Sequence, residues 1–293
     1  MPSRHGLVAY TQNARGDMVH YNLAFRFLIT DVERFPPEHR NCLWLDFTDE
    51  LWLGAYAASG IAASLVPAVG AAAGIAVCWP WLKDADSVAD LARITAIGVV
   101  PATLVGFVTT ALVILGAVRL LGHGLREGYH PIHGGQGWRA WTTIRLLDEA
   151  RTWLFPLYSS TLTPVWLRAL GARIGKDVEA STVLMLPKMA DIGAGSFLAD
   201  DTLVANYELG GGWIRIAPVK VGKGAFLGNS GMAAPGRKVP KNGLVAVLSA
   251  APDRAKSGSS WLGSPPIRLR RTAATTDTSR TFDPPVRLKV ARA

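Results

Sequence analysis

Two stretches of this chain are apolar over their whole length and lack the one-sided polar face of a soluble helix. Residues Leu51–Leu82 contain no Asp, Glu, Lys or Arg, and neither do residues 94–118. About 20 apolar residues suffice to cross the hydrocarbon core of a bilayer. The pattern therefore predicts a transmembrane helical hairpin over residues 51–118, with spans at about 53–79 and 94–118. Two buried helices in a large soluble core are the alternative, and the absence of a charged face disfavours them.

A second pattern starts at Ile174, where aliphatic or small residues recur at every sixth position. A period of six fits neither a helix nor a flat strand. It predicts a solenoid of short strands whose inward side chains stack in one core. The following residue is small or proline in almost every case, which permits a tight turn. The repeated positions are Ile174, Ala180, Leu186, Ile192, Leu198, Val204, Gly210 and Ile216, and, after a slip of one, Val221, Leu227, Ala233, Val239 and Val245.

The segment between these regions carries apolar residues at three- to four-residue spacing over residues 138–157, which predicts an amphipathic helix. Two positions for this helix stay open: the membrane interface, which its tryptophans favour, and the surface of the next domain. The fragment Tyr21–Thr30 is expected to form a strand or a short helix, which Pro36-Pro37 interrupts. We expect five parts: an unassigned segment (1–50), the helical hairpin (51–118), a juxtamembrane amphipathic linker (119–171), the solenoid (172–271) and a basic tail (272–293).

Composition agrees with a membrane protein, since 49 % of the residues are apolar and only 18 % are charged. The formal net charge of +9 comes from a basic surplus that begins after the second apolar run, at Arg119 and Arg126. By the positive-inside tendency, both ends of the hairpin and the solenoid lie in the cytoplasm, on a multi-pass protein of the cell membrane. The sequence shows no basic stripe interleaved with aromatic residues, so we expect no nucleic-acid partner. Only two cysteines occur, which excludes a disulfide framework or a zinc ribbon.

The six-residue period resembles that of the hexapeptide-repeat acyltransferases, and the resemblance implies a left-handed parallel β-helix. The expected fold is therefore mixed, a two-helix transmembrane hairpin plus a left-handed parallel β-helix. A closer resemblance covers roughly residues 135–290. The phrases RTWLFPLY, LADDTL, YELGGGW, FLGNSG and APGRKVP, which begin at Arg151, Leu198, Tyr207, Phe226 and Ala234, are similar to the membrane-bound C-terminal region of nonribosomal peptide synthetases of the ε-poly-L-lysine synthetase type.

In that family, transmembrane helices alternate with acetyltransferase-like domains that follow an adenylation and a carrier domain. The resemblance implies peptide-bond formation between an aminoacyl group on the phosphopantetheine of the carrier and an acceptor amine. It implies phosphopantetheine or coenzyme A as cofactor, and the carrier and adenylation domains as partners. Hexapeptide-repeat acyltransferases also form trimers, so a homo-oligomer is possible. Because 293 residues leave no room for adenylation and carrier domains, we expect a fragment or a stand-alone partial copy.

No histidine occurs within residues 134–293. The β-helix therefore cannot supply the histidine that acts as general base in hexapeptide acetyltransferases. It also cannot supply the histidine ligands that hold zinc in the related carbonic anhydrases, and we expect no metal. His130 and His133 are expected in a juxtamembrane loop, since two ligands are too few for a metal site.

The candidates for chemistry are residues that interrupt the repeat. Glu208, Asp201 and Asp200 are the candidate catalytic acids. The adjacent carboxylates of Asp200 and Asp201 can shift one another's pKa, and Glu208 replaces the small residue expected at its position in the repeat, in a loop that leaves the coil. A solvated turn or a salt bridge is the alternative for the aspartate pair. Asn206 and Tyr207 precede a glycine-rich loop at residues 210–212 and are the candidates for substrate binding. Asn229, Arg237 and Lys238, with Lys241 nearby, are the candidates for the phosphate of a pantetheine arm; the alternative is a basic solvated edge.

Two functions follow from these residues. The first is an acyltransferase-like module in which Glu208 or Asp201 deprotonates the acceptor amine. The second is a non-catalytic β-helix scaffold that docks the carrier domain or a sibling module at the membrane.

Overall fold

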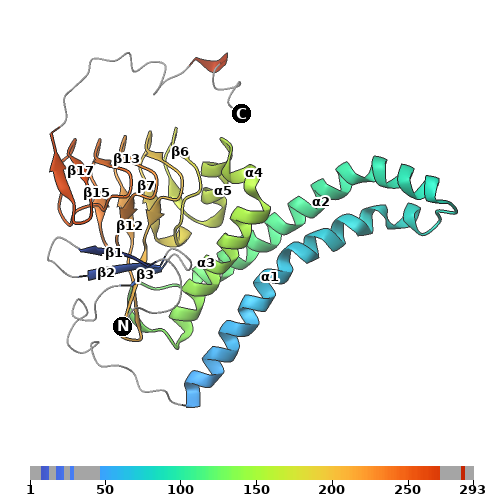
Figure 1. Cartoon of the computed structure of the whole chain (residues 1–293), viewed down its shortest axis with the longest axis horizontal. Helices are drawn as coiled ribbons and strands as arrows, with labels where there is room; N and C mark the ends of the chain where they lie inside the picture. The colour runs from blue at the N-terminus through green and yellow to red at the C-terminus, as the bar shows by residue number, and fades with distance from the viewer. Residues whose placement is uncertain (1–7, 13–17, 23–26, 30–46, 271–284, 288–293) are drawn as a thin grey trace.

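The computed structural model describes residues 8–12, 18–22, 27–29, 47–270 and 285–287. Most of the N-terminal segment, including Pro36-Pro37, and most of the basic tail lie outside these described residues. Figure 1 shows a long helical hairpin that projects from a body of stacked strands, with short helices where the two meet. Of the fragment expected as a strand or short helix, strands are seen: β2 (Met18–Asn22) pairs antiparallel with β3 (Phe27–Ile29) and with β1 (Val8–Gln12).

The hairpin consists of α1 (Phe47–Leu82) and α2 (Val88–His123). Both helices are long and apolar enough to cross a membrane, by length and composition. Each extends beyond the predicted span. The helix α2 starts at Val88 because the hydroxyl of Ser87 caps it and accepts a hydrogen bond from the backbone N–H of Asp90 at 3.1 Å. Charged residues in the first turns limit a membrane span but not a helix.

The two helices cross closely at small residues, as Gly70-xxx-Gly74 predicts. A Cβ added at Gly70 would lie 2.7 Å from the carbonyl oxygen of Gly106, and one added at Gly74 would overlap the backbone of Ala102. The thiol of Cys78 packs against Gly98, with its Sγ 3.5 Å from the carbonyl oxygen. Glycines on the inner side therefore set the distance between the two helices.

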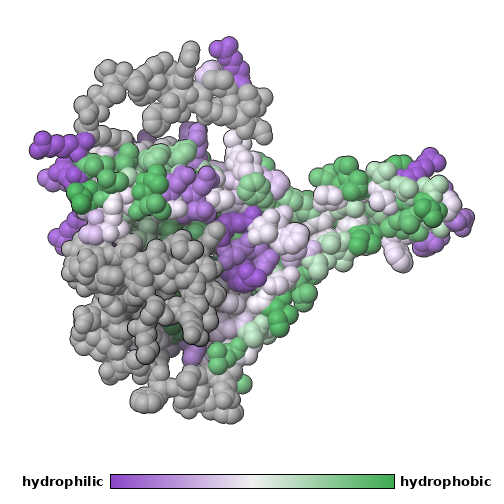
Figure 2. All heavy atoms as spheres, in the orientation of Figure 1, coloured by the Kyte–Doolittle hydropathy of each residue, from purple (hydrophilic) through white to green (hydrophobic). Residues whose placement is uncertain are grey.

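The outer side of the hairpin is apolar and uncovered. Leu104 is 60 % exposed near the middle of α2, and Figure 2 shows hydrophobic residues along both projecting helices. A water-soluble helix turns such side chains towards a core. The other exposed apolar residues of the pair are Leu51, Leu53, Ile61, Leu65, Val69, Ile75, Trp79, Trp81, Val88, Leu91, Ile97, Val99, Val100, Val108, Leu112, Val113 and Leu120.

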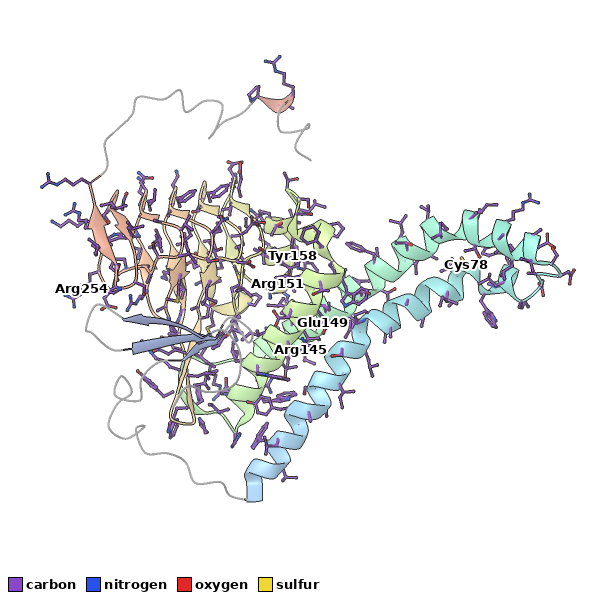
Figure 3. The ribbon with its side chains drawn as sticks, in the orientation of Figure 1. Cys78, Arg145, Glu149, Arg151, Tyr158 and Arg254 are labelled. Atoms are coloured by element: carbon purple, nitrogen blue, oxygen red, sulfur yellow. The ribbon has the colours of Figure 1, made fainter. Side chains whose placement is uncertain are left out.

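The predicted amphipathic helix is α3 (Gly135–Trp153), which ends before Pro156 and is followed by α4 (Phe155–Tyr158) and α5 (Thr163–Leu170). Of the two open positions for this helix, the structure shows packing against other elements. Trp138 donates a hydrogen bond to Ser59 of α1 at 2.7 Å, while Leu147 and Ala150 are buried in the core shared with the β-helix. Figure 3 shows Arg145 and Glu149 on α3; Arg145 pairs with Glu149 at 2.6 Å and contacts Ser64 of α1 at 3.1 Å.

The β-helix follows α5 and confirms the six-residue period. Ile174 pairs with Ile192, Leu198 with Leu227, and Val221 with Val239, all in parallel register, so three hexapeptides make one regular coil. The strands are β5 (Arg173–Ile174), β6 (Glu179–Ala180), β7 (Ala190–Ile192), β8 (Phe197–Leu198), β9 (Leu203–Val204), β12 (Val219–Val221), β13 (Phe226–Leu227), β14 (Met232–Ala233), β15 (Lys238–Val239), β16 (Leu244–Val245), β17 (Ser260–Leu262) and β18 (Ile267–Leu269), with a 3-10 turn at Pro187–Met189. The left-handed sense of the coil stays a prediction from the resemblance.

These strands form three faces that share one core. The first face is β15-β12-β7-β5, the second is β18-β17-β16-β13-β8-β6, and the third is β14-β9. The inward residues Ile192, Leu198, Val204 and Leu227 are buried, as expected for a stacked aliphatic core.

The residue after an inward position must be small for a second reason besides the tight turn. A Cβ added at Gly193 would lie 2.5 Å from the backbone nitrogen of Lys223, and one at Gly222 would lie 2.5 Å from that of Lys241. Neighbouring coils thus approach so closely that their backbones leave no room for a side chain at these two positions.

The assignment of Gly210 and Ile216 to the repeat was wrong. Residues 207–216 leave the coil as an antiparallel hairpin, β10 (Tyr207–Gly210) and β11 (Trp213–Ile216). This insertion joins β4 (Gly128–Pro131), which contains His130, so the expectation of a loop was wrong for His130, whereas His133 lies in the bend between β4 and α3. On its other side β10 pairs with β3, giving a sheet of order β1-β2-β3-β10-β11-β4.

Candidate functional site

The predicted site residues fall on two different corners of the β-helix. Asp200, Asp201 and Asn229 lie between the second and third faces, at what we call the acidic corner. The backbone N–H of Ser230 donates to the carbonyl oxygen of Asp200 at 2.9 Å, which stacks Asn229 on Asp200 in successive coils. The candidates at residues 206–208 and Arg237 lie between the third and first faces, at what we call the hairpin corner, and Lys238 follows on the first face, in β15.

At the acidic corner both aspartates are exposed. The hydroxyl of Ser181 donates a hydrogen bond to the carboxylate of Asp200, and the backbone N–H of Asp201 donates to Thr182 at 2.9 Å. Asp201 has a positive φ of 54°, a value that Asp177 also adopts at another corner of the first coil. The hydroxyl of Thr182 also lies 3.4 Å from the carboxylate of Asp201, so both aspartates are hydrogen-bonded within a solvent-exposed turn.

At the hairpin corner Asn206 holds the base of the insertion. Its side chain accepts a hydrogen bond from the backbone N–H of Leu186 at 2.9 Å and donates one to the carbonyl oxygen of Met189 at 2.8 Å. Its own carbonyl oxygen accepts from Ala217 at 2.9 Å, where the chain re-enters the coil. Asn206 has no exposed surface, and Tyr207 is buried beside Ile216, so neither is accessible to a substrate in this conformation.

Glu208 is buried in an ion pair with Arg215 on the neighbouring strand of the insertion. The two side chains are joined at 2.8 Å, with 6 % of the Glu208 side chain and 33 % of the Arg215 side chain exposed. The Arg215 guanidinium also lies 5.7 Å from the centre of the Tyr129 ring, on the next strand of the same sheet. A row of acid, guanidinium and phenol therefore crosses β10, β11 and β4.

The pKa of Arg215 is raised above its usual value. Burial alone lowers it, but the hydrogen bond and the negative charge of Glu208 outweigh burial, with smaller contributions from Tyr129 and Glu127. Arg215 is thus a permanent cation, and Glu208 is its fixed counter-charge. In this arrangement Glu208 is placed to orient Arg215 rather than to meet a substrate.

The basic residues of the late coils do not form one slot with Asn229. Arg237 pairs with Asp253 at 2.7 Å and donates a hydrogen bond to the carbonyl oxygen of Ala251, so its guanidinium is engaged within the coil. Lys238 is exposed and lies opposite Lys220 in the register of β12 and β15. Lys220 and Lys238 therefore present two neighbouring cations on the first face.

Arg215 and Tyr129 are the residues of this site that the sequence analysis missed. A signal for Arg215 was present. Glu208 and Arg215 are placed symmetrically about Gly211 and Gly212, whose φ angles of 54° and 82° are those of a two-residue hairpin turn. Alternating apolar residues flank that turn, so the segment predicts a hairpin. No comparable signal links Tyr129 to this hairpin, because the pairing of β4 with β11 spans a long sequence separation.

No group of three or more His, Cys, Asp or Glu side chains that could hold a metal ion occurs among the residues that the structure describes. His130 contacts the carbonyl oxygen of Arg126 at 3.2 Å.

Comparison with known proteins gives two sequence matches. Residues 4–85 match the family model of the MmyB-like transcription regulator ligand binding domain, a segment that ends near the tip of the helical hairpin and does not include the β-helix. The chain is also 32 % identical over 198 residues to the delta-poly-L-ornithine synthetase of Acinetobacter baumannii (strain AB307-0294). That alignment covers 66 % of this chain and 15 % of the relative, so the chain spans a small part of the relative's length.

Among solved structures, the chain is similar to a hexapeptide-repeat-containing acetyltransferase from Vibrio cholerae, with 14 % identity, a TM-score of 0.31, and coverage of 43 % of this chain and 91 % of that one. A soybean serine acetyltransferase matches at 13 % identity and a TM-score of 0.27, over 78 % of this chain and all of that one (100 %). A galactoside acetyltransferase in complex with coenzyme A matches at 12 % identity and a TM-score of 0.28, over 47 % of this chain and 86 % of that one. The architecture of the present chain is established by its own strand pairing.

Proposed function

We propose that this chain is a membrane-anchored, acyltransferase-like module of a nonribosomal peptide synthetase. The observation that carries the proposal is the 198-residue similarity to a delta-poly-L-ornithine synthetase, in a chain that combines hexapeptide coils with two long apolar helices. In the proposed reaction, an acceptor amine attacks the carbonyl carbon of an aminoacyl thioester on phosphopantetheine. The C–N bond forms, the C–S bond breaks, and a base takes the amine proton and returns it to the departing thiolate, so that the thiol is released.

The anchoring is proposed from the surface of the hairpin. The exposed apolar side chains of α1 and α2 suit hydrocarbon better than water, since burying a leucine-sized side chain stabilises by about 1.5–3 kcal/mol. We propose that both helices cross the cell membrane and that the β-helix faces the cytoplasm. Arg119 and Arg126 at the end of α2 agree with that orientation.

The burial of Glu208 changes the assignment of roles among the three candidate acids. A carboxylate with 6 % of its surface exposed, already paired with Arg215, is poorly placed to take a proton from an acceptor amine. We therefore propose the acidic corner, Asp200 and Asp201, as the base, and Glu208 as a residue that positions Arg215. For the phosphate of phosphopantetheine or coenzyme A, Lys238 with Lys220 is the better-exposed pair, whereas Arg237 is held by Asp253.

A second candidate function is favoured by the same contacts. Asn206, Tyr207 and Glu208 all serve the insertion itself, and the β-helix has no histidine. A non-catalytic scaffold that docks a carrier domain or a sibling module needs only the cationic and acidic surfaces. A possible homo-oligomer belongs to the same hypothesis.

The test uses the full chain in lipid nanodiscs, supplied with the L-ornithyl thioester of pantetheine and free L-ornithine, with the dipeptide measured by mass spectrometry. We expect dipeptide formation that falls at least about a hundredfold in Asp201→Asn, the lower limit of a typical contribution from general-base catalysis. Asp177→Asn is the matched control, because Asp177 is equally exposed and has the same positive φ. Full activity of both Asp200→Asn and Asp201→Asn overturns the base assignment.

Absence of dipeptide, together with heat of binding from a phosphopantetheinylated carrier domain in calorimetry, favours the scaffold. If neither product nor binding is observed, both proposed functions fail.

A further inference from the structure

A cavity at the base of α2 is used by neither proposed function. Its volume is about 170 Å³, and it lies where the end of α2 meets α3, α5 and the first coil of the β-helix. Its apolar wall is formed by Val118, Leu125, Leu170 and Leu186. The cavity is thus built from four separate elements.

Three cationic or titratable side chains line the same cavity: Arg119, His123 and Lys188. All three are exposed, and they are linked by the backbone. The ammonium of Lys188 donates to the carbonyl oxygen of His123 at 3.1 Å, and Nδ1 of His123 lies 3.1 Å from the carbonyl oxygen of Arg119. No carboxylate lines the cavity, and the guanidinium of Arg119 has no hydrogen bond or ion pair among the described residues. The cavity therefore has a basic opening above an apolar wall.

The partial negative charge at the carboxyl ends of helices explains part of this cluster of basic residues. The carboxyl ends of α2 and α5 both lie here, and cations are favoured beside the last carbonyl groups of a helix. Lys188 fulfils this role through its bond to His123. The apolar wall, and the guanidinium of Arg119 with its full set of donors, are left unexplained by helix-end neutralisation.

The position of the cavity indicates what it binds. Arg119 directly follows the charge-free run of α2, and the next residue, Leu120, is 73 % exposed. If α2 crosses the bilayer as proposed above, Arg119 lies at the depth of the lipid headgroups. Guanidinium and ammonium groups are good partners for phosphate oxygens, and an apolar wall suits the first carbons of an acyl chain.

We propose that this basic cavity binds the phosphate of one anionic phospholipid in the cytoplasmic leaflet. The inference rests on the proposed membrane anchoring by α1 and α2. The ligand chemistry is a phosphodiester with attached acyl chains, and the bound lipid fixes the depth of α2 at its cytoplasmic end. A free phosphate shares the anionic group but lacks the chains.

The experiment places the full chain in nanodiscs of phosphatidylcholine with phosphatidylglycerol and counts the lipids that remain bound in native mass spectrometry. We expect one retained phosphatidylglycerol, and at least about tenfold weaker retention in the double variant Arg119→Gln, Lys188→Gln, because this variant removes both fixed cations at the opening of the cavity. The double variant Arg126→Gln, Arg268→Gln is the matched control, because both residues are exposed and lie outside the cavity.

A second variant tests the cavity without removing charge. In Gly122→Leu the added Cβ meets only the Cβ of Lys188, at 3.9 Å. The position therefore accepts a side chain, and a leucine there reduces the open volume of the cavity while it favours the helix. We expect it to lose the bound lipid although Arg119, His123 and Lys188 are all present. Retention of phosphatidylglycerol by both the charge variant and Gly122→Leu overturns the inference.

Two further outcomes separate the possibilities. Displacement of the lipid by millimolar inorganic phosphate identifies a site for a soluble anion and also overturns the lipid assignment. Failure of the wild-type chain to enter nanodiscs overturns the anchoring and this inference together. Entry without a preference for phosphatidylglycerol overturns this inference alone.

Discussion

The β-helix and the helical hairpin use glycine for the same purpose and then treat their aliphatic residues in opposite ways. In both regions backbones approach so closely that a Cβ does not fit, at Gly222 against Lys241 and at Gly70 against Gly106. In the β-helix this contact encloses a column of buried side chains such as Leu227. In the hairpin it leaves residues such as Leu104 directed outward. Close backbone packing is thus common to both regions. The β-helix buries its aliphatic side chains within its own core, whereas the hairpin leaves many of its aliphatic side chains exposed.

The largest expected effect comes from closing the gap between coils. Gly222→Ala places a Cβ 2.5–2.9 Å from the backbone around Pro240 and Lys241, which cannot move without separating two coils. We expect the free energy of unfolding to fall by about 3 kcal/mol or more, or the chain not to fold. Chemical unfolding in detergent checks this. Gly54→Ala is the control, because nothing lies within 4 Å of its added Cβ. Equal stability of the two variants contradicts the close approach of the coils.

The next largest effects are expected from removing a leucine side chain, and these should differ between the β-helix and the helical hairpin. Leu227→Ala empties part of the β-helix core and is expected to destabilise by about 2–5 kcal/mol, because Leu227 is fully buried. Leu104→Ala removes an outward side chain and is expected to cost less than about 1 kcal/mol in the same assay. A large cost at Leu104 reveals a protein partner on that face, which lipid alone does not supply.

A charged side chain on the outer face of α2 tests whether lipid surrounds this helix. Leu104→Lys near the middle of the second apolar run is expected to cost about 2.5–3.5 kcal/mol of membrane insertion. The measurement is the fraction of the chain that resists an alkaline wash of isolated membranes, and we expect this fraction to drop. Leu248→Lys, at an exposed corner of the β-helix, is the control. If both variants stay fully membrane-bound, lipid does not contact α2 at Leu104.

The smallest effect is expected at the insertion. Glu208→Gln keeps a hydrogen-bond acceptor but leaves Arg215 without its counter-charge, and a cost of about 1–2 kcal/mol is expected after allowing for the partial exposure of Arg215. Proteolysis of the 207–216 segment is expected to become faster, while thermal unfolding of the coils changes little. Unchanged proteolysis shows that the pair does not hold the hairpin in place.

The regular parts of this fold could be predicted because they are local and periodic. The core column from Ile192 to Val245 follows from the six-residue spacing, and the two apolar helices follow from the missing charges. The insertion could not be found by the same rule, because Gly210 and Ile216 coincide with the period while their backbone leaves the coil. The spacing of apolar residues in the sequence does not distinguish a coil residue from a hairpin residue. Only the pairing of the strands shows where the backbone leaves the coil.

The candidate site was predicted less well for a related reason. Asp200, Asp201 and Asn229 do stack at one corner. The aspartates do not interrupt the coil, however, because they lie between β8 and β9, whose inward residues Leu198 and Val204 keep the six-residue spacing. Arg215 and Tyr129 act through cross-strand neighbours that are distant in the sequence, and the burial of Glu208 depends on this packing. Which acids stay accessible is therefore a property of the tertiary fold.

The insertion β10–β11 has a consequence for how the chain can be divided. It pairs on one side with β3, which precedes the helical hairpin, and on the other with β4, which follows it. The segments on both sides of the helical hairpin are thus joined through a ribbon that belongs to the solenoid. A fragment that starts at residue 172 would expose both edges of that ribbon, and unpaired strand edges invite self-association. The helical hairpin and the solenoid are best produced as a single piece.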